Sequence, residues 1–229
     1  MIEAPTVPPR RADVSLEGGR ILAIAAPDSP PPDEARSGPA ASGPGVAEVC
    51  RADGLWLAPA LVDPHSVLED PLQGRAETLT SLRAVAALGG YGTVALLPWA
   101  RSWRDRPDRL ALGWQEPMRL LLWGSFSLDG ADRDLAPHAD QLEAGALGLS
   151  GGENLPPLDL LERGLQLREM GSRPVLLAPR DGALGHQGFV RERVEALRAG
   201  WPLDPVISET LPLQALLTLR NSLPAVSVR

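Results

Sequence analysis

Short apolar runs alternate with amphipathic stretches from residue 55 to the end of the chain. The apolar runs predict strands at 55–62, 93–97, 118–123, 146–149 and 174–177, with a last short one at 225–228. The amphipathic stretches predict helices at 76–88, 135–143, 158–170, 192–199 and 209–219. Strands separated by helices are typical of right-handed βα units, so we expect an α/β protein with a parallel sheet.

The first 54 residues have a different texture. Residues 13–26 predict two short strands around a Gly-Gly turn, and 46–50 predict one more strand. Between them, residues 27–45 are dense in proline, glycine, serine and charge, as in a loop or a disordered insert. We therefore expect two domains, 1–54 with the small strands and 55–229 with the βα units.

Composition excludes several classes of function. The net charge is −7, with acidic and basic residues interspersed, so no basic face is expected for nucleic acid or anionic lipid. No apolar run approaches the length of a membrane span, and the N-terminus lacks the apolar core of a secretory signal. The one cysteine, Cys50, fits a reducing cytoplasm and is read as a small apolar residue.

Several catalytic and nucleotide-binding motifs are absent. All 22 basic residues are arginine, which excludes lysine as a Schiff-base former, general base or carbamylated metal ligand. Neither a G-x-G-x-x-G after a strand nor a phosphate-binding loop with lysine occurs, and no G-x-S-x-G elbow supports a serine nucleophile. A doubly wound nucleotide-binding sheet thus loses its main support. Part of a (β/α)8 barrel remains, with active groups at the carboxyl ends of the strands.

Five segments in order resemble a known family. They are "DVSLEGGRILAIAA", "GLWLAPALVDPH", "ETLTSLRAVAALGGYGTVALLP", "GALGLS" and "FVRERVEALRAGWPLDPVISET". Together they resemble dihydroorotases of the amidohydrolase superfamily, and within it a divergent cyanobacterial branch. The resemblance implies a TIM-type (β/α)8 barrel beside a small β-sandwich. It also implies a zinc enzyme of pyrimidine biosynthesis that hydrolyses or closes a cyclic amide.

The family's first metal motif falls on "LVDPHSVLEDP", residues 61–71. Two histidines one residue apart and then an arginine are expected; this chain has His65, Val67 and Glu69 instead. His65 is retained, whereas Val67 cannot bind a metal. Glu69 reverses the charge expected to hold the substrate carboxylate. Two like charges at about 4 Å repel by roughly 4 kcal/mol at an effective dielectric constant of about 20, so Glu69 opposes an anionic substrate.

The later ligand positions are also changed. Where the resemblance implies asparagine after Pro98, the chain has Trp99. The expected aspartate falls on Gly151 or Gly152, and the expected histidine falls on Ala178. Zinc takes four ligands in structural sites and three plus water in catalytic sites, so His65 alone is not a site. No bound cofactor is expected.

Other titratable residues are candidates for replacement ligands. Asp63, Asp70, Glu153 and Asp181 follow predicted strands. Asp63 is expected to accept a hydrogen bond at its strand end. His138, on a predicted helix, is expected to be solvated. His186 lies in the loop "DGALGHQG", which the resemblance places near the substrate.

Length predicts an incomplete barrel. A complete (β/α)8 barrel needs about 250 residues, whereas the chain after the N-terminal strands has room for five or six βα units of roughly 30 residues. The final "SLPAVSVR" reads as a sixth strand cut short, and the family's last catalytic aspartate is absent. An open sheet edge favours association. We expect the sheet face bearing Leu57, Val94, Leu96, Leu120 and Leu176 to be partly open, with the contact near the first barrel strand and 225–228.

Three hypotheses follow. The favoured one is a metal-free, inactive dihydroorotase homologue that binds another protein or itself; the resemblance implies aspartate transcarbamoylase as a partner. The second is a working cyclic amidohydrolase with an unconventional site. The third is a truncated product without function.

Overall fold

The computed structural model describes residues 10–27, 50–68, 77–100, 103–110 and 118–223 of the chain. Its contacts divide the chain into two compact units, Met1–Trp56 and Leu57–Arg229. In the first unit, β1 (Asp13–Glu17) and β2 (Arg20–Ala25) form an antiparallel hairpin, as predicted. Gly18 and Gly19 turn the chain with φ of +55° and +75°, which glycine adopts without steric cost. Of the strand expected at 46–50, only Cys50 lies within the described residues, and it is exposed.

The second unit is built on parallel strands that follow one another in chain order. One sheet contains β3 (Leu61–Ser66), β4 (Tyr91–Leu96) and β5 (Arg119–Leu122), and the other contains β6 (Gly124–Ser125), β7 (Leu149–Ser150) and β8 (Val175–Leu176). Only Trp123 separates β5 from β6, and the Leu147 amide donates to the Leu122 carbonyl across that point (2.8 Å). The parallel α/β arrangement is therefore confirmed.

The first barrel strand lies further along the chain than 55–62. It begins where the Leu61 amide donates to the Gly90 carbonyl (2.9 Å) and continues through Pro64 to Ser66. Leu55, Trp56 and Leu57 precede the strand and are exposed. Proline has no N–H, but β3 is the edge strand of its described sheet, where a missing donor is tolerated. The motif around His65 is thus inside the strand and not after it.

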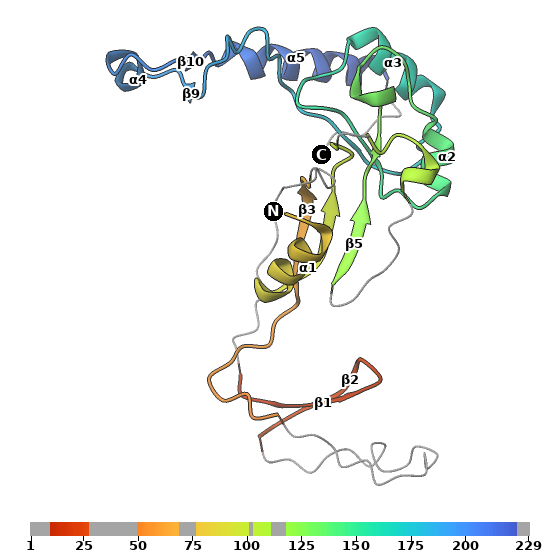
Figure 1. The fold of residues 1–229 in the computed structure, drawn as a ribbon, viewed down its shortest axis with the longest axis vertical. Helices are drawn as coiled ribbons and strands as arrows, with labels where there is room; N and C mark the ends of the chain where they lie inside the picture. Colours follow the sequence, from red (N-terminus) through yellow and green to blue (C-terminus); the bar gives the residue numbers. More distant parts are fainter. Residues whose placement is uncertain (1–9, 28–49, 69–76, 101–102, 111–117, 224–229) are drawn as a thin grey trace. The chain divides into compact units, whose positions relative to one another are not determined.

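Helix α1 (Leu79–Leu88) lies against the β3–β4–β5 sheet (Figure 1). The helix begins later than the predicted residue 76 because Thr78 caps it. The Thr78 hydroxyl accepts from the Ser81 amide (3.1 Å), and the Ser81 hydroxyl accepts from the Thr78 amide (2.8 Å).

Alternation along the strands creates two apolar layers. Val94, Leu96 and Leu120 are buried in the layer that includes Ala86 of α1. Ala95, Leu97 and Trp123 form the opposite layer, with Leu176 packed against them. Val94, Leu96 and Leu120 therefore share one face, as expected, but that face is buried. The expectation is wrong for Leu176, which packs in the opposite layer, and for Leu57, which precedes β3.

Two further helices follow β6 and β7. Helix α2 (His138–Glu143) begins three residues later than predicted because the residue before Pro137 is disfavoured in helical geometry. Helix α3 (Leu158–Leu167) buries Leu160 and Leu161 against Phe126 and Leu149.

The C-terminal part contains the helix predicted at 192–199, between two short strands that the pattern did not predict. Strands β9 (Val190–Arg191) and β10 (Leu203–Asp204) pair in parallel and flank α4 (Val194–Arg198). The longer α5 (Ile207–Ser222) follows, containing Pro212. The strand expected at 225–228 lies outside the described residues. Within the described part of the chain, no helix is long and apolar enough to cross a membrane.

Leu161 tests the packing of α3. Its side chain is fully buried, whereas Leu167 on the same helix is 53% exposed. We expect Leu161→Ala to lower the free energy of unfolding by about 2–5 kcal/mol, since the substitution removes buried methyl groups and leaves a cavity. The control Leu167→Ala should change it by less than about 0.5 kcal/mol. Urea titrations measure both; equal effects would show that α3 does not pack as described.

Candidate functional site

The retained histidine lies on an exposed stretch of β3. His65 is exposed, and its amide donates to Asp63 Oδ1 (3.1 Å). The other oxygen of Asp63 accepts from the Ser66 hydroxyl (2.5 Å). Both oxygens of Asp63 are therefore used locally, in short turns of the strand itself. Val67 is exposed and has no atom that can bind a metal.

The Trp123 side chain packs next to β3. Its indole is buried, and Nε1 donates to the Pro64 carbonyl across 2.8 Å. The indole lies against Gly148, where a Cβ would come within 2.8 Å of Trp123 Cζ3. Glycine at 148 thus makes room for the ring. This hydrogen bond connects the end of β5 to the carbonyl that immediately precedes His65.

Trp99 makes a second connection of the same kind. It follows β4 and Pro98, and its Nε1 donates to the Gly151 carbonyl (2.9 Å), just beyond β7. The Ser150 hydroxyl donates to the same carbonyl (3.0 Å). The structure thus brings together Trp99, where the resemblance implies asparagine, and Gly151, one of the two positions at which it implies aspartate.

A buried arginine occupies a third strand end. Arg104 Nη2 donates to the carbonyl of Leu97 (2.5 Å), and the Arg104 amide donates to that of Pro98 (3.2 Å). We call Trp99, Arg104 and Trp123 the rim donors. Together they satisfy carbonyls at the carboxyl ends of β3, β4 and β7 with side-chain N–H groups. In a barrel, this edge is where substrates bind.

A buried carboxylate supports the segment that carries Arg104. Asp105 is fully buried; it accepts from Arg109 Nη1 (2.9 Å) and from the Asp129 amide (2.8 Å). Sequence reasoning missed this pair, although the spacing in "RDRPDR" places an aspartate four residues before an arginine. It holds the loop after β4 against residue 129 and thereby fixes the position of Arg104.

The candidates after β8 do not add ligands. Ala178 presents a methyl group, and its carbonyl accepts from the Arg180 amide (2.8 Å). Asp181 Oδ1 accepts from the amides of Ala183 and Leu184 (2.9 and 3.1 Å). His186 is exposed in a turn, with φ of +49°. Glu153 is exposed as well.

His138 differs from its expected, solvated position. It is fully buried at the start of α2, and Nε2 donates to the Phe126 carbonyl (2.8 Å). Nδ1 has no hydrogen-bond partner among the described residues. Burial lowers the pKa of His138, an effect that the Phe126 carbonyl and the charge of Glu169 partly oppose. The helix that contains it packs onto β6, so its face is internal.

An ionic cluster ties β9, β10 and α5 together. Arg180 pairs with Asp204 (3.0 Å), Arg191 pairs with Glu209, and the Ser208 hydroxyl donates to Asp204 (2.7 Å). The Ser208 hydrogen bond, with the two arginines, holds the pKa of Asp204 below its usual value. The sequence did not reveal this cluster, since its members are distant along the chain.

These residues do not fit zinc. No group of three or more histidine, cysteine, aspartate or glutamate residues could hold a metal ion in the described ranges. Zinc needs at least three protein ligands at a catalytic site. Glu69 and Asp70, two of the positions considered from the sequence, lie outside those ranges.

Comparison with known proteins agrees with the sequence motifs. No protein-family model matches the chain. A probable dihydroorotase-like protein of Synechocystis is 29% identical over 202 residues, covering 77% of this chain and 46% of that protein. A dihydroorotase of Desulfotalea psychrophila is 27% identical over 166 residues, covering 70% and 39%. The chain resembles the dihydroorotases. It spans less than half the length of these dihydroorotase relatives.

The likeness extends to the fold. An L-hydantoinase (dihydropyrimidinase) from Arthrobacter aurescens superposes with a TM-score of 0.61 at 20% identity, over 92% of this chain and 47% of its own. The parallel strands therefore form part of an amidohydrolase-type (β/α)8 barrel, which confirms the fold expected from the sequence. The edge bearing the rim donors corresponds to the carboxyl ends of the barrel strands.

The burial of His138 predicts a pH dependence. Its folded-state pKa lies below that of the unfolded chain, so the unfolded state takes up the proton first as pH falls. We expect the free energy of unfolding to decrease as pH falls from 7 to 5. That decrease should be smaller in His138→Gln, which cannot titrate there. Urea titrations across this range, with the exposed His186→Gln as control, measure the difference. Identical slopes in all three proteins would contradict the burial of His138.

Proposed function

We propose that this dihydroorotase-like chain has no hydrolase activity and binds no zinc, and that it acts by binding another protein. The observation that carries the proposal is the occupation of the barrel edge by the rim donors. Trp123, Arg104 and Trp99 engage the carbonyls of Pro64, Leu97 and Gly151 with bulky side chains. An active site at this edge would need that space for a metal, water and substrate.

Loss of donor atoms supports the same proposal. The resemblance implies histidines at Val67 and Ala178 and an aspartate at Gly151 or Gly152, and none of these residues has a side-chain donor atom for a metal. These positions follow different strands, so a substitution that restores one ligand leaves the others missing. Reversal by a single substitution is therefore not expected.

Exposed apolar side chains support a role in protein binding. Phe189, Val194, Leu197 and Trp201 are 74%, 59%, 67% and 55% exposed around the β9–α4–β10 unit. Groups of exposed large apolar side chains mark interaction surfaces on folded proteins. Aspartate transcarbamoylase, which the resemblance implies as a partner, and a second copy of the chain are the proteins to test first.

Metal content and turnover test the proposal. We expect purified chain, dialysed against zinc and then against buffer, to retain no stoichiometric zinc and to hydrolyse no dihydroorotate. Val67→His should behave in the same way, because Trp99, Gly151 and Ala178 are unchanged. Elemental analysis and a dihydroorotate assay measure both properties. The Desulfotalea psychrophila dihydroorotase, treated identically, is the positive control.

One outcome would overturn the proposal. Zinc bound at one ion per chain and lost in His65→Ala, together with turnover lost in the same variant, would favour a cyclic amidohydrolase with an unconventional site. Zinc retained equally by wild type and His65→Ala would instead indicate adventitious binding.

A further inference from the structure

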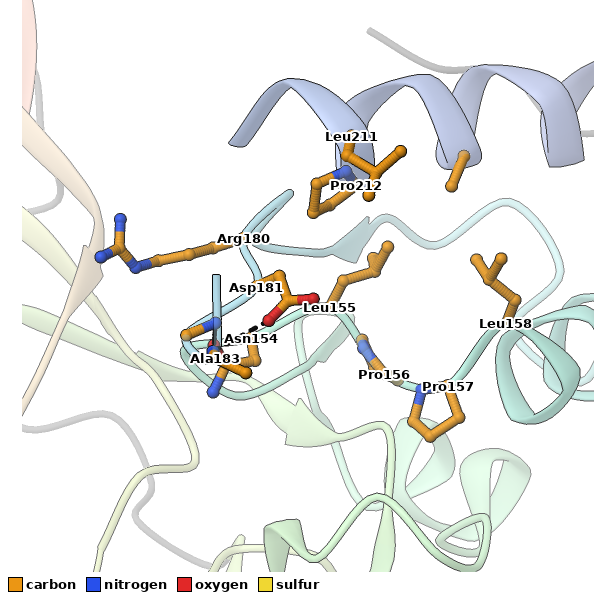
Figure 2. A pocket seen from close by; sticks show the side chains of 12 residues that line it. Asn154, Leu155, Pro156, Pro157, Leu158, Arg180, Asp181, Ala183, Leu211 and Pro212 are labelled. Carbon is orange, nitrogen blue, oxygen red and sulfur yellow. Dashed lines mark hydrogen bonds between the residues drawn. The ribbon is translucent and has the colours of Figure 1, made fainter. Parts of the chain in front are cut away.

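An open groove lies beside the rim, between the loop after β7 and the first half of α5. Its volume is about 540 Å³, within the range of roughly 300–1,000 Å³ that ligand sites occupy. Figure 2 shows apolar side chains from both sides facing it. Its apolar lining includes Leu155, Pro157, Leu158, Leu211, Pro212 and Ala215. The groove therefore offers an apolar surface to whatever occupies it.

Pro212 helps to fix the shape of the groove. Proline has no N–H, so the carbonyl of Ser208, four residues earlier in α5, has no helical donor. That carbonyl accepts instead from the Asp181 amide (2.8 Å). On the other side, the Gly182 amide donates to Asn154 Oδ1 (2.7 Å). These two hydrogen bonds connect all three segments that line the groove, so its shape is set before a ligand arrives.

The groove has an acidic end. Asp181 Oδ1 binds two amides, whereas Oδ2 accepts no hydrogen bond from the described residues. In Figure 2 the Asp181 carboxylate is directed towards Leu155, and Arg180 extends away from the groove. Arg180 is also engaged by Asp204 (3.0 Å) and Glu209 (3.5 Å). Arg180 also lines the groove, but these two carboxylates engage its guanidinium, so the Asp181 carboxylate is the charge offered to a ligand.

We propose that this groove binds an extended apolar peptide segment of a partner protein, with an arginine or lysine placed to pair with Asp181. Leucine and proline side chains provide the apolar contact, and the carboxylate selects a positive charge. An open groove whose lining segments are joined by hydrogen bonds can accept a peptide in an extended conformation. This inference rests on the proposed protein-binding function and names the class of segment that the partner presents.

Fluorescence anisotropy with defined peptides tests this inference on the full chain. The probe is a fluorescein-labelled hexapeptide of alternating leucine and proline with one arginine, and its control has glutamate at the same place. We expect saturable binding of the arginine peptide and binding of the glutamate peptide that is weaker by about fivefold or more. Asp181→Asn keeps an oxygen for the Ala183 and Leu184 amides but removes the charge. It should weaken binding about fivefold, the effect of one partly exposed ion pair.

Substitutions on α5 provide a matched pair. Ala215 lines the groove, whereas Gln214 is exposed on the same helix and does not. Ala215→Trp should abolish binding by filling the groove, and Gln214→Trp should leave it unchanged; thermal melts confirm that both fold.

Three results would overturn the inference: no saturable binding by the wild type, equal binding of the two peptides, or normal binding by a folded Ala215→Trp. These results give no information about zinc binding or turnover, so the proposed lack of catalysis is tested independently by those assays.

Discussion

The hydrogen bonds from two indoles to strand-end carbonyls are the interactions on which the rest of the barrel edge depends. Trp123 joins the end of β5 to Pro64, and Trp99 joins the end of β4 to Gly151. Trp123 is buried and Trp99 is half-buried, and an indole N–H removed from water needs an acceptor, which each of these bonds supplies. The Trp123 ring also fills the volume beside Gly148, where a Cβ would come within 2.8 Å of Cζ3.

This arrangement changes what the edge of the barrel can do. A metal would hold strand ends together through its ligands; here side-chain donors connect them and leave apolar rings in the space. Arg104 is the third rim donor and donates to the Leu97 carbonyl. The ion pair of Asp105 with Arg109 holds the loop that carries it. The groove between Asn154 and α5, lined by apolar side chains with Arg180 and Asp181, is where we propose that a partner binds. This packing is what supports the proposal that the chain recognises a protein segment and does not catalyse hydrolysis.

Much of the fold could be predicted because it depends on local pattern. The hairpin at 13–26 and the order of parallel strands and helices follow from periodicity and turn residues. Three features could not be predicted: where β3 begins, the burial of His138, and which residues lie on each face of the sheet. Each depends on contacts between residues that are far apart in the sequence. His138 is buried by Phe126, and Trp123 finds its acceptor 59 positions earlier in the chain. The residues Val67 and Ala178 at expected ligand positions were visible in the sequence, whereas the hydrogen bonds of Trp99, Arg104 and Trp123 at the strand ends were not.

Hydrogen exchange of the indole N–H groups tests the central claim most directly. In two-dimensional NMR spectra, with signals assigned by Trp→Phe substitution, the Nε1–H of Trp123 and Trp99 should exchange slowly. Those of the exposed Trp56 and Trp201 should exchange rapidly, and equimolar zinc should move none of the four signals. Rapid exchange of Trp123 and Trp99, or a zinc-dependent shift of either signal, would contradict the account and show that the barrel edge is open to a ligand.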